Sequence, residues 1–421
     1  MSNTALTDTL ARIFRAALAS LDPARLVHEA LPPLPPRNAR VVVIAAGKAA
    51  AAMARGALTR WPDRIDRVLV VGPDPIAVFT DPRVRELAAS HPIPDERSVI
   101  AAEAALALAA DLGPGDLLVA LISGGASSLL ASPAAGLSLP EKQAIVATLL
   151  DRGAPIREVN LVRRHLSRVK GGRLARAAIP ARVLSLIFSD VIGGEAHDIG
   201  SGPTVPDPTT IDDARAVLRT HAPELADAAF LDESLKAETP VTILAAAAEV
   251  PAAARLRARI LVDPSSLAAA MRERLELAGF HATVEGPDEG DAAAVVDRRI
   301  ARAATLAPGE AVVIACEPTV HLPAVRGSGG RAGWVALAAM RRLPEGVALL
   351  CAASDGVDGS SGAGGAGVTR DARAAIADDD IDRALATFDD ARIHRALGTH
   401  LQGGPTGHNL ADLHVLARSR S

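Results

Sequence analysis

The sequence has few aromatic residues, at 2% of the chain, with six Phe, two Trp and no Tyr. Proteins that bind single-stranded nucleic acid stack bases on aromatic side chains, and this chain offers few such platforms. Its formal net charge of -4 gives no broad cationic field for a polyanion or an anionic membrane. We therefore expect neither a nucleic-acid partner nor a membrane partner.

Cysteine is also scarce, with two residues, too few for a disulfide framework. Cys316 and Cys351 each end an apolar run, which is typical of small buried core residues. No run of about 18 consecutive strongly apolar residues is present, as a membrane-spanning helix would need. The first residues lack the basic and then apolar pattern of a secretion signal. The sequence predicts a soluble, cytoplasmic protein.

The length and apolar content predict two packed domains. The chain has 421 residues, 49% hydrophobic and 22% charged, which excludes a disordered chain. One domain usually takes about 100 to 200 residues. The polar stretch at residues 232–240 suggests the boundary, with an N-terminal domain over residues 1–236 and a C-terminal domain over residues 237–421.

Short apolar runs alternate with longer Ala-rich segments of helical period, which is typical of α/β units around a mostly parallel sheet. The predicted strands are Val41–Ala46, Val68–Val71, Leu117–Ile122, Val183–Phe188, Val241–Ala246, Ala311–Cys316 and Val347–Ala353. The predicted helices include Ser98–Leu112, Glu141–Leu150, Ser265–Ala278 and Asp291–Leu306.

Polar residues directly follow five of the predicted strands, where open α/β sheets bind their ligands. They are Lys48, the loop Ser123-Gly124-Gly125-Ala126-Ser127-Ser128, Asp190, Glu317 and Asp355. Glycine exposes backbone N–H groups, lysine neutralises oxyanions, and carboxylates hold Mg²⁺. Together they predict a phosphate ligand with a divalent cation. The alternatives are a surface lysine at a helix start and a purely structural turn.

Two further segments are candidates for a site. Residues 160–173 cluster basic side chains, and Arg163, Ser167 and Lys170 would share one helical stripe facing a carboxylate or phosphate. The alternative is a solvated helix face. Residues 356–367 are rich in glycine and resemble a mobile substrate or nucleotide loop, with a plain linker as the alternative.

Two known phosphate-binding motifs do not fit the sequence. The P-loop fails because Val42 replaces its first glycine and Ala49 follows Lys48. Gly362, Gly364 and Gly367 match G-x-G-x-x-G but lie well past the end of their strand, which disfavours a nicotinamide reductase. Neither the His nor the Cys spacing is that of a zinc site.

The chain resembles the class II glycerate 2-kinase family, also known by its DUF4147 and MOFRL domains, with some members described as hydroxypyruvate reductases. The matching motifs run along most of the chain: Gly47-Lys48-Ala49, His91-Pro92-Ile93-Pro94-Asp95, Ser123-Gly124-Gly125-Ala126-Ser127, Asn160 with Arg163, Lys170-Gly171-Gly172-Arg173, Ser189-Asp190-Val191-Ile192-Gly193, Ser201-Gly202-Pro203-Thr204, Gly329-Gly330-Arg331, Asp355-Gly356-Val357-Asp358-Gly359 and Gly404-Pro405-Thr406-Gly407.

The resemblance implies a Rossmann-like three-layer N-terminal domain, a smaller α/β C-terminal domain and an interdomain cleft. It implies transfer of the ATP γ-phosphoryl group to the C2 hydroxyl of D-glycerate with Mg²⁺. Its substrates would be a small hydroxy acid and a nucleotide, and a homodimer is compatible with the sequence. The implied catalytic residues are Lys48, Asp190 and Arg331; the binding residues are Ser123, Gly124, Gly125, Ser127, Asn160, Arg163, Lys170, Glu317 and Asp355; the metal ligands are Asp190 and Glu317.

Several positions depart from the family pattern, and four of them bear most on the site. Gly194 and Trp334 replace carboxylates, Ala332 replaces an amide, and His408 replaces a threonine. A kinase for another hydroxy acid or polyol, with Trp334 and His408 recognising the acceptor, is therefore one alternative. A non-catalytic paralogue that binds an anion or a nucleotide is another.

Overall fold

The computed structural model describes residues 3–33, 37–75, 79–226 and 256–420, which divide into two compact units. The N-terminal unit comprises residues 23–189 and 194–261, and the C-terminal unit comprises residues 1–22, 190–193 and 262–421, each within the described ranges. The predicted boundary at 236/237 and the predicted strand Val241–Ala246 lie outside the described residues. The boundary and the interdomain cleft stay predictions.

The N-terminal unit has a six-stranded sheet in the order β3-β2-β1-β4-β5-β6. Its strands are β1 (Val41–Ala46), β2 (Arg67–Pro73), β3 (Val84–Ala89), β4 (Leu117–Ser123), β5 (Arg182–Phe188) and β6 (Leu256–Val262). The pairings among β1 to β5 are parallel. Every residue of β1 and β4 is buried, as continuous apolar runs require. The predicted Rossmann-like parallel sheet is confirmed.

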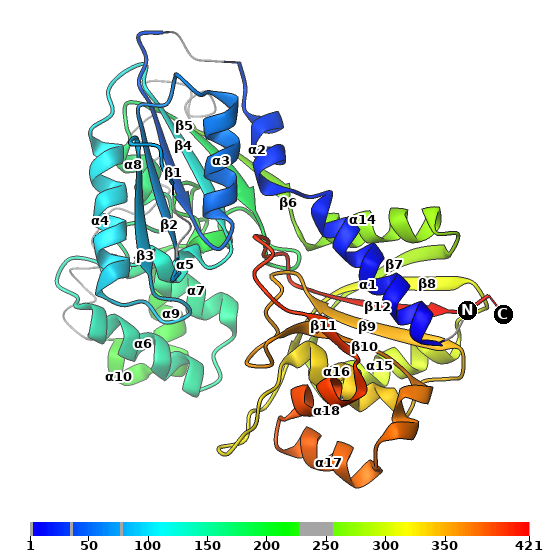
Figure 1. Ribbon diagram of the computed structural model, residues 1–421. Coiled ribbons are helices and arrows are strands. Elements are labelled where there is room, and N and C mark those ends of the chain that lie inside the picture. The colour runs from blue at the N-terminus through cyan, green and yellow to red at the C-terminus, as the bar shows by residue number, and fades with distance from the viewer. Residues whose placement is uncertain (1–2, 34–36, 76–78, 227–255, 421) are drawn as a thin grey trace. The chain divides into compact units, whose positions relative to one another are not determined.

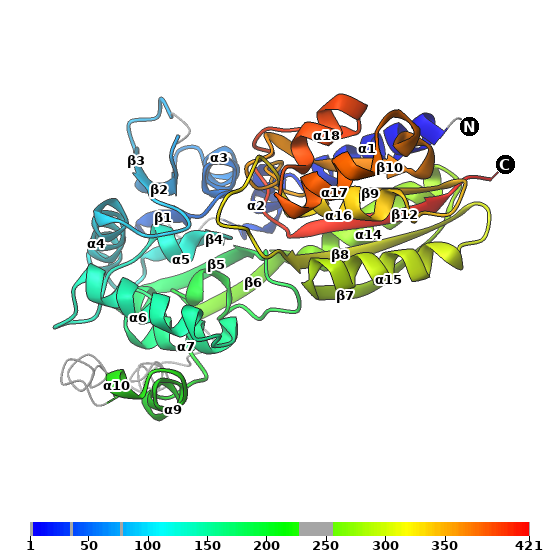
Figure 2. The same ribbon diagram turned by 90° about the horizontal axis from the view of Figure 1, so that it is seen from below.

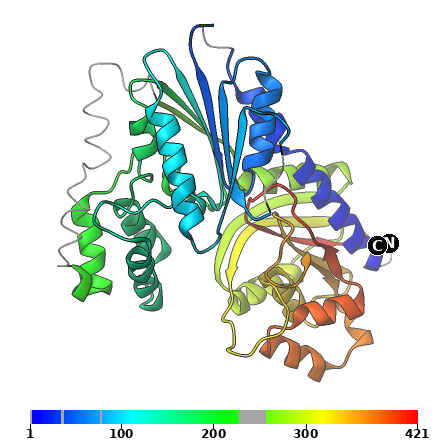
Figure 3. The same ribbon diagram turned by 60° about the vertical axis from the view of Figure 1, so that its left-hand side comes forward.

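The helices of this unit lie on both faces of the sheet and to one side of it (Figure 1 and Figure 3). They are α2 (Pro23–Ala30), α3 (Ala50–Arg60), α4 (Glu96–Ala110), α5 (Ala126–Leu129), α6 (Leu139–Asp151), α7 (Ile156–His165), α8 (Arg173–Ala177), α9 (Ile211–His221) and α10 (Pro223–Ala226), with a 3₁₀ turn at Ile199–Ser201. Figure 1 shows α3 on one face and α4 on the other. The helices α6, α7 and α9 share a small apolar core of their own and extend to one side of the sheet (Figure 3).

The C-terminal unit has a second six-stranded sheet, in the order β11-β10-β9-β12-β8-β7. Its strands are β7 (His281–Asp291), β8 (Glu310–Thr319), β9 (Val347–Ala353), β10 (Ala363–Thr369), β11 (His400–Gln402) and β12 (Asp412–Arg418). Only β7 and β8 pair in parallel, so the expected mostly parallel arrangement is wrong for this sheet. Apolar runs report burial on both faces but not strand direction.

Helices also cover both faces of the second sheet. They are α1 (Asn3–Ala19), α14 (Pro264–Leu277), α15 (Ala292–Ala304), α16 (Arg331–Met340), α17 (Asp378–Ala386) and α18 (Asp390–Leu397), with a 3₁₀ turn at Arg370–Ala375. In Figure 1, α1 and α14 lie on one face and α15 and α16 on the other, and Figure 2 views the unit from the side of α16 to α18. None of the helices in the described ranges is long and apolar enough to cross a membrane.

The glycine-rich segment expected to be a mobile loop is partly a strand. Residues 363–369 form β10, all seven of them buried, and residues 365–369 pair with β9. A Cβ on Gly365 would lie 2.1 Å from the carbonyl oxygen of Cys351, so the glycine allows the strands to approach closely. The mobile-loop prediction is therefore wrong for this part. Gly364 and Gly367 lie within the strand rather than on a strand-to-helix turn.

The two cysteines are core residues, as predicted. Cys316 and Cys351 are free and fully buried in the second sheet. Burial raises the pKa of both thiols above its usual value, which keeps them protonated and unreactive.

Candidate functional site

The first group of predicted residues lies at the carboxyl edge of the N-terminal sheet. The backbone N–H of Lys48 donates to the Gly124 carbonyl at 2.9 Å, and the N–H of Ala49 donates to Ser123 Oγ at 3.1 Å. The turn after β1 therefore contacts the loop after β4, as the parallel pairing of these strands requires. The Ser123 side chain is fully buried, and its hydroxyl holds the two loops together.

Gly125 marks where this loop passes between two side chains. A Cβ added there would lie 3.1 Å from His91 Cδ2 and 3.6 Å from Lys48 Cγ. The glycine loop, Lys48 and the imidazole of His91 are therefore neighbours. In the sequence, His91 stands out only as part of a family motif, because a lone histidine in a loop gives no chemical signal.

Lys170 is buried beside the same loop. Its Nζ donates to Ser127 Oγ at 3.0 Å and to the Leu130 carbonyl at 3.1 Å. Ser127 Oγ also lies 3.0 Å from Ser201 Oγ. Lys170 thus supports the Ser127 turn with its hydrogen bonds. Burial, followed by repulsion from Lys142 and Arg163, lowers the pKa of its amine well below the usual value.

The predicted helical stripe of Arg163, Ser167 and Lys170 is wrong, because α7 ends at His165. The hydroxyl of Ser167 donates to the Ser132 carbonyl instead. Arg163 and Lys170 nevertheless line one pocket of about 430 Å³, together with Ser127. Arg163 Nη1 donates to Asn160 Oδ1 at 3.1 Å, so Asn160 orients the guanidinium.

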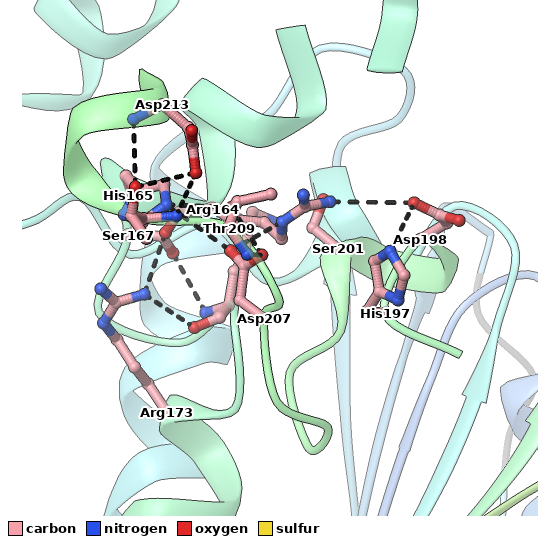
Figure 4. A network of polar contacts seen from close by, with 12 residues as sticks. Arg164, His165, Ser167, Arg173, His197, Asp198, Ser201, Asp207, Thr209 and Asp213 are labelled. Atoms are coloured by element: carbon pink, nitrogen blue, oxygen red, sulfur yellow. Dashed lines mark hydrogen bonds and ion pairs between the residues drawn. The ribbon is translucent and has the colours of Figure 1, made fainter. Parts of the chain in front are cut away.

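Part of the basic segment is a buried ion-pair network rather than a solvated face. Figure 4 shows Arg164, His165 and Thr209 around Asp207. Arg164 Nε donates to Asp207 Oδ2 at 2.8 Å, and the Thr209 hydroxyl donates to Oδ1 at 2.6 Å. Arg173 donates to the carbonyls of Arg164 and Lys170. Burial, only partly offset by Asp207, lowers the pKa of His165 to about 4, so its imidazole is neutral.

The second group of predicted residues lies in the C-terminal unit. Asp190 belongs to the segment 190–193, and its Oδ2 accepts a hydrogen bond from Asn409 Nδ2 at 2.7 Å. Asn409 follows the Gly404–Gly407 motif in sequence. Its side chain therefore fixes the orientation of the Asp190 carboxylate.

Arg331, the first residue of α16, bridges two carboxylates. Its Nε donates to Asp412 Oδ2 at 2.6 Å, and its Nη1 donates to Glu317 Oε1 at 3.3 Å. In the sheet, Asp412 stands beside Cys316 of β8 and Ala353 of β9. Burial raises the pKa of Asp412 to about 7, although Arg331 opposes this shift. Asp412 gives no signal as a site residue in the sequence because it begins an unpredicted strand.

Glu317 lies near the end of β8 rather than after it as predicted, and Asp355 follows β9. The two strands run in the same direction because β12 is antiparallel to both. The Glu317 side chain is 49% exposed. Asp355 Oδ1 accepts a hydrogen bond from the Val357 N–H. In the described part of the chain, no three His, Cys, Asp or Glu side chains gather into a metal cage.

The start of α16 is held by two buried carboxylates. Asp358 accepts hydrogen bonds from the N–H groups of Ala332 and Gly333 at 3.0 and 2.8 Å, and Asp390 accepts one from Gly330 at 3.3 Å. Burial, with a further contribution from Asp358, raises the pKa of Asp390 to about 7. These contacts fix the helix end that carries Arg331.

We expect Gly330→Ala to lower the free energy of unfolding by about 1–3 kcal/mol, the usual cost of overpacking. The added Cβ would lie 2.1 Å from Asp358 Cγ and force the carboxylate away from the helix end. Thermal unfolding of Gly113→Ala is the control, because its Cβ meets nothing nearer than 3.8 Å. Equal stability of the two variants would contradict this packing.

The departures from the family pattern have local explanations. Trp334 Nε1 donates to the Leu385 carbonyl at 3.1 Å, and its ring packs against the core of the C-terminal unit. These contacts give no support to a role for Trp334 in acceptor recognition. Ala332 is fully buried in that core. His408 is also buried, and burial lowers the pKa of its imidazole. Nothing in the structure explains Gly194.

Comparison with known proteins places the chain in a family. The model described as "Domain of unknown function (DUF4147)" matches residues 9–231, and the MOFRL family model matches residues 310–412. A putative hydroxypyruvate reductase of Agrobacterium vitis is 39% identical over 97% of this chain and 93% of its own length. The D-glycerate 2-kinase of Thermotoga maritima is 33% identical over 95% of each chain.

A solved structure agrees with the sequence comparisons. The crystal structure of glycerate kinase from Thermotoga maritima matches with a TM-score of 0.86 and 30% identity, covering 99% of this chain and 100% of the other. The fold, both family models and the relatives therefore agree. The chain belongs to the DUF4147–MOFRL family of glycerate 2-kinases.

Proposed function

We propose that the chain is an ATP-dependent glycerate 2-kinase that converts D-glycerate to 2-phosphoglycerate with Mg²⁺. The observation that carries the proposal is the contact of the Lys48 turn with the glycine loop after β4, at the carboxyl edge of the parallel sheet. An ammonium group beside a glycine loop suits a phosphate ligand. Relatives named glycerate 2-kinase support the acceptor and the product.

The proposed roles follow from charge and hydrogen bonding. Phosphoryl transfer depends mainly on positioning and charge neutralisation. Lys48 neutralises the charge of the transferring phosphoryl group. The backbone of Gly124 and Gly125 lies beside the place proposed for this group. Arg331, held in place by Asp412, neutralises a second anionic group.

Further residues complete the proposed site. Ser127, Lys170 and Asn160 with Arg163 form its anion-binding wall in the N-terminal unit. Glu317 pairs with Arg331, and we propose that Asp355 adds a carboxylate after β9.

Asp190 is the proposed base for the reaction. The C2 hydroxyl of glycerate must lose its proton as its oxygen bonds to phosphorus, and a carboxylate at hydrogen-bond distance can accept that proton. The Asn409 amide occupies Oδ2 of Asp190 and holds the carboxylate plane in one orientation. This arrangement supports a positioned acceptor rather than a freely rotating side chain.

The residues present are compatible with Mg²⁺. This ion keeps several water ligands and takes one or two carboxylates together with substrate phosphates, so an all-protein cage is not required. Asp190 and Glu317 offer hard oxygen donors of the right kind. When bound, Mg²⁺ would neutralise charge on the phosphate oxygens.

The test is ADP release from ATP and D-glycerate. We expect turnover with Mg²⁺ and a fall of about 100-fold or more when EDTA removes it, with recovery on adding Mg²⁺ back. Direct consumption of the product by enolase identifies 2-phosphoglycerate. If ADP is released only with another hydroxy acid or polyol, that compound replaces D-glycerate as the proposed acceptor. If no acceptor gives ADP, the non-catalytic alternative is favoured.

The name of the Agrobacterium vitis relative raises reduction of hydroxypyruvate as a second activity. The glycine motif that could suggest a dinucleotide site, Gly362 to Gly367, extends into the buried strand β10 and opens no helix. This placement disfavours dinucleotide binding there. Oxidation of NADH or NADPH by the protein with hydroxypyruvate would overturn this interpretation.

A further inference from the structure

A pocket of about 430 Å³ lies within the N-terminal unit, beside the loop Pro92–Pro94, helix α6 and the end of α7. One part of its wall is apolar and includes Ile93 and Leu150, which remain 67% and 46% exposed. Another part is cationic and includes Lys142, Arg163 and Lys170. No Asp or Glu is among its described lining residues, so the lining supplies no negative charge.

Lys142 is the unusual residue of this pocket. It lies on α6 with 5% of its surface exposed, and its Nζ has no hydrogen-bond partner within the described structure. Lys170, by contrast, donates to Ser127 and Leu130. A buried amine without a partner is costly, and a protein usually pairs such a group with an anion.

We propose that this pocket binds an organic anion, a carboxylate or phosphate group joined to an apolar body, and that Lys142 and Arg163 hold the acid group. The acid oxygens would give the Lys142 amine the acceptors that it lacks. The Arg163 guanidinium, which lines the same pocket, supplies the fixed positive charge. The apolar body would cover Ile93 and Leu150. A bare inorganic anion would leave that apolar wall in water.

This inference adds Lys142 to the pocket and does not require phosphoryl transfer. It shares Arg163 and Lys170 with the proposed kinase site, but its test is binding rather than turnover. If the protein binds the probes below but releases no ADP, the kinase proposal fails and the pocket proposal stands. If it releases ADP but binds none of the probes, the pocket proposal fails and the kinase proposal stands.

Protonation of the Lys142 amine on binding gives a measurable test of this proposal. Burial, followed by repulsion from Arg163 and Arg173, lowers its pKa to about 7. Lys170 also lines the pocket, and burial, followed by repulsion from Lys142 and Arg163, lowers its pKa well below the usual value. The fixed positive charge that acts on the Lys142 amine is therefore that of Arg163 and Arg173. Because an anion favours the charged amine, binding raises its pKa, and at pH 7 the complex takes up about half a proton. Affinity should fall by about tenfold or more from pH 7 to pH 9.

The experiment is isothermal titration calorimetry of the full chain with AMP, hexanoate and inorganic phosphate, in two buffers of different ionisation enthalpy. We expect AMP or hexanoate to bind about tenfold or more tightly than phosphate, with proton uptake. AMP alone would identify a nucleotide-like ligand, and hexanoate alone would identify an aliphatic acid. Either result supports the pocket.

Lys142→Met is the decisive variant. It should weaken binding of AMP or hexanoate by about tenfold or more and abolish the proton uptake. Its fold should survive, because replacing an unpaired buried amine with an apolar side chain is neutral or stabilising. Arg152→Met removes a basic side chain that lies at the C-terminal end of the same helix, outside the pocket, and pairs with Glu224. It should bind within about twofold of the unmodified protein.

Three results would overturn the proposal. The first is no binding of any of the three probes. The second is equal affinity for phosphate and for both apolar-bodied anions. The third is Lys142→Met that binds like the unmodified protein, or that unfolds at a markedly lower temperature, which would make Lys142 a structural residue.

Discussion

Asp207→Asn is expected to lower the free energy of unfolding of the N-terminal unit by about 3–5 kcal/mol, the usual cost of breaking a buried ion pair. Asp207 is fully buried, and its two oxygens serve different donors. Oδ1 accepts from Thr209, while Oδ2 accepts from Arg164 Nε. An amide nitrogen at the second position would face the guanidinium donor to donor, and flipping the amide would only transfer the conflict to Thr209.

The loss of charge adds to the loss of hydrogen bonds. Arg164 and Arg173 are both nearly inaccessible to solvent, with 3% and 9% of their surfaces exposed. Without Asp207, the carboxylate that remains near the Arg164 guanidinium among the described residues is Asp198, whose oxygen lies 3.8 Å away. A buried cation without a close partner is strongly destabilising.

The two tryptophans allow this effect to be measured in one unit. Trp61 is buried in the N-terminal unit and Trp334 lies in the C-terminal unit. In a Trp334→Phe background, the fluorescence of Trp61 follows unfolding of the N-terminal unit by urea. The control is Asp213→Asn, which changes the exposed third residue of α9, the partner of the N-cap Thr210 in a capping box, and should cost about 0.5–2 kcal/mol. If Asp207→Asn unfolds at the same urea concentration as this control, the network does not stabilise the unit.

The sequence predicted the strands that are apolar on both faces, because continuous apolar runs report burial directly. β1 and β9 have the predicted bounds. It missed β10, where small glycines pair closely with β9, and β12, which begins with a charged residue, Asp412. The close backbone approach of β10 and the ion pair of Asp412 with Arg331, which is distant in sequence, are tertiary contacts. Such contacts leave no periodic pattern of apolar residues in a single sequence.

The same reasoning explains which site residues were found. Lys48 and the glycine loop directly follow buried strands, so strand ends predicted their position and the structure brings them together. Asn409 and Lys142 were missed because their roles depend on tertiary structure. Asn409 meets Asp190 across 219 positions of sequence, and Lys142 occupies an ordinary helical position whose burial appears only after folding.

Lys48→Met is expected to lower kcat for ADP release by about 10²–10³, the loss typical of removing one preorganised group that stabilises transition-state charge. Phosphoryl transfer places negative charge on the transferring group and the leaving oxygens, and Lys48 stands at the glycine loop proposed to receive them. Since this charge develops during the reaction, kcat should fall much more than KM for glycerate rises.

Stability and a matched control separate catalysis from folding in this experiment. Lys48 is only partly buried, so its substitution should change the free energy of unfolding by about 0.5 kcal/mol or less. Arg60→Met removes the same charge from an exposed position at the far end of α3, and we expect its kcat to stay within about twofold of the unmodified value. Lys48→Arg keeps the charge but moves it outward on a longer, planar group, so it should restore only part of the activity. Full turnover by Lys48→Met would remove Lys48 from the catalytic site and leave charge neutralisation to Arg331 and the metal ion.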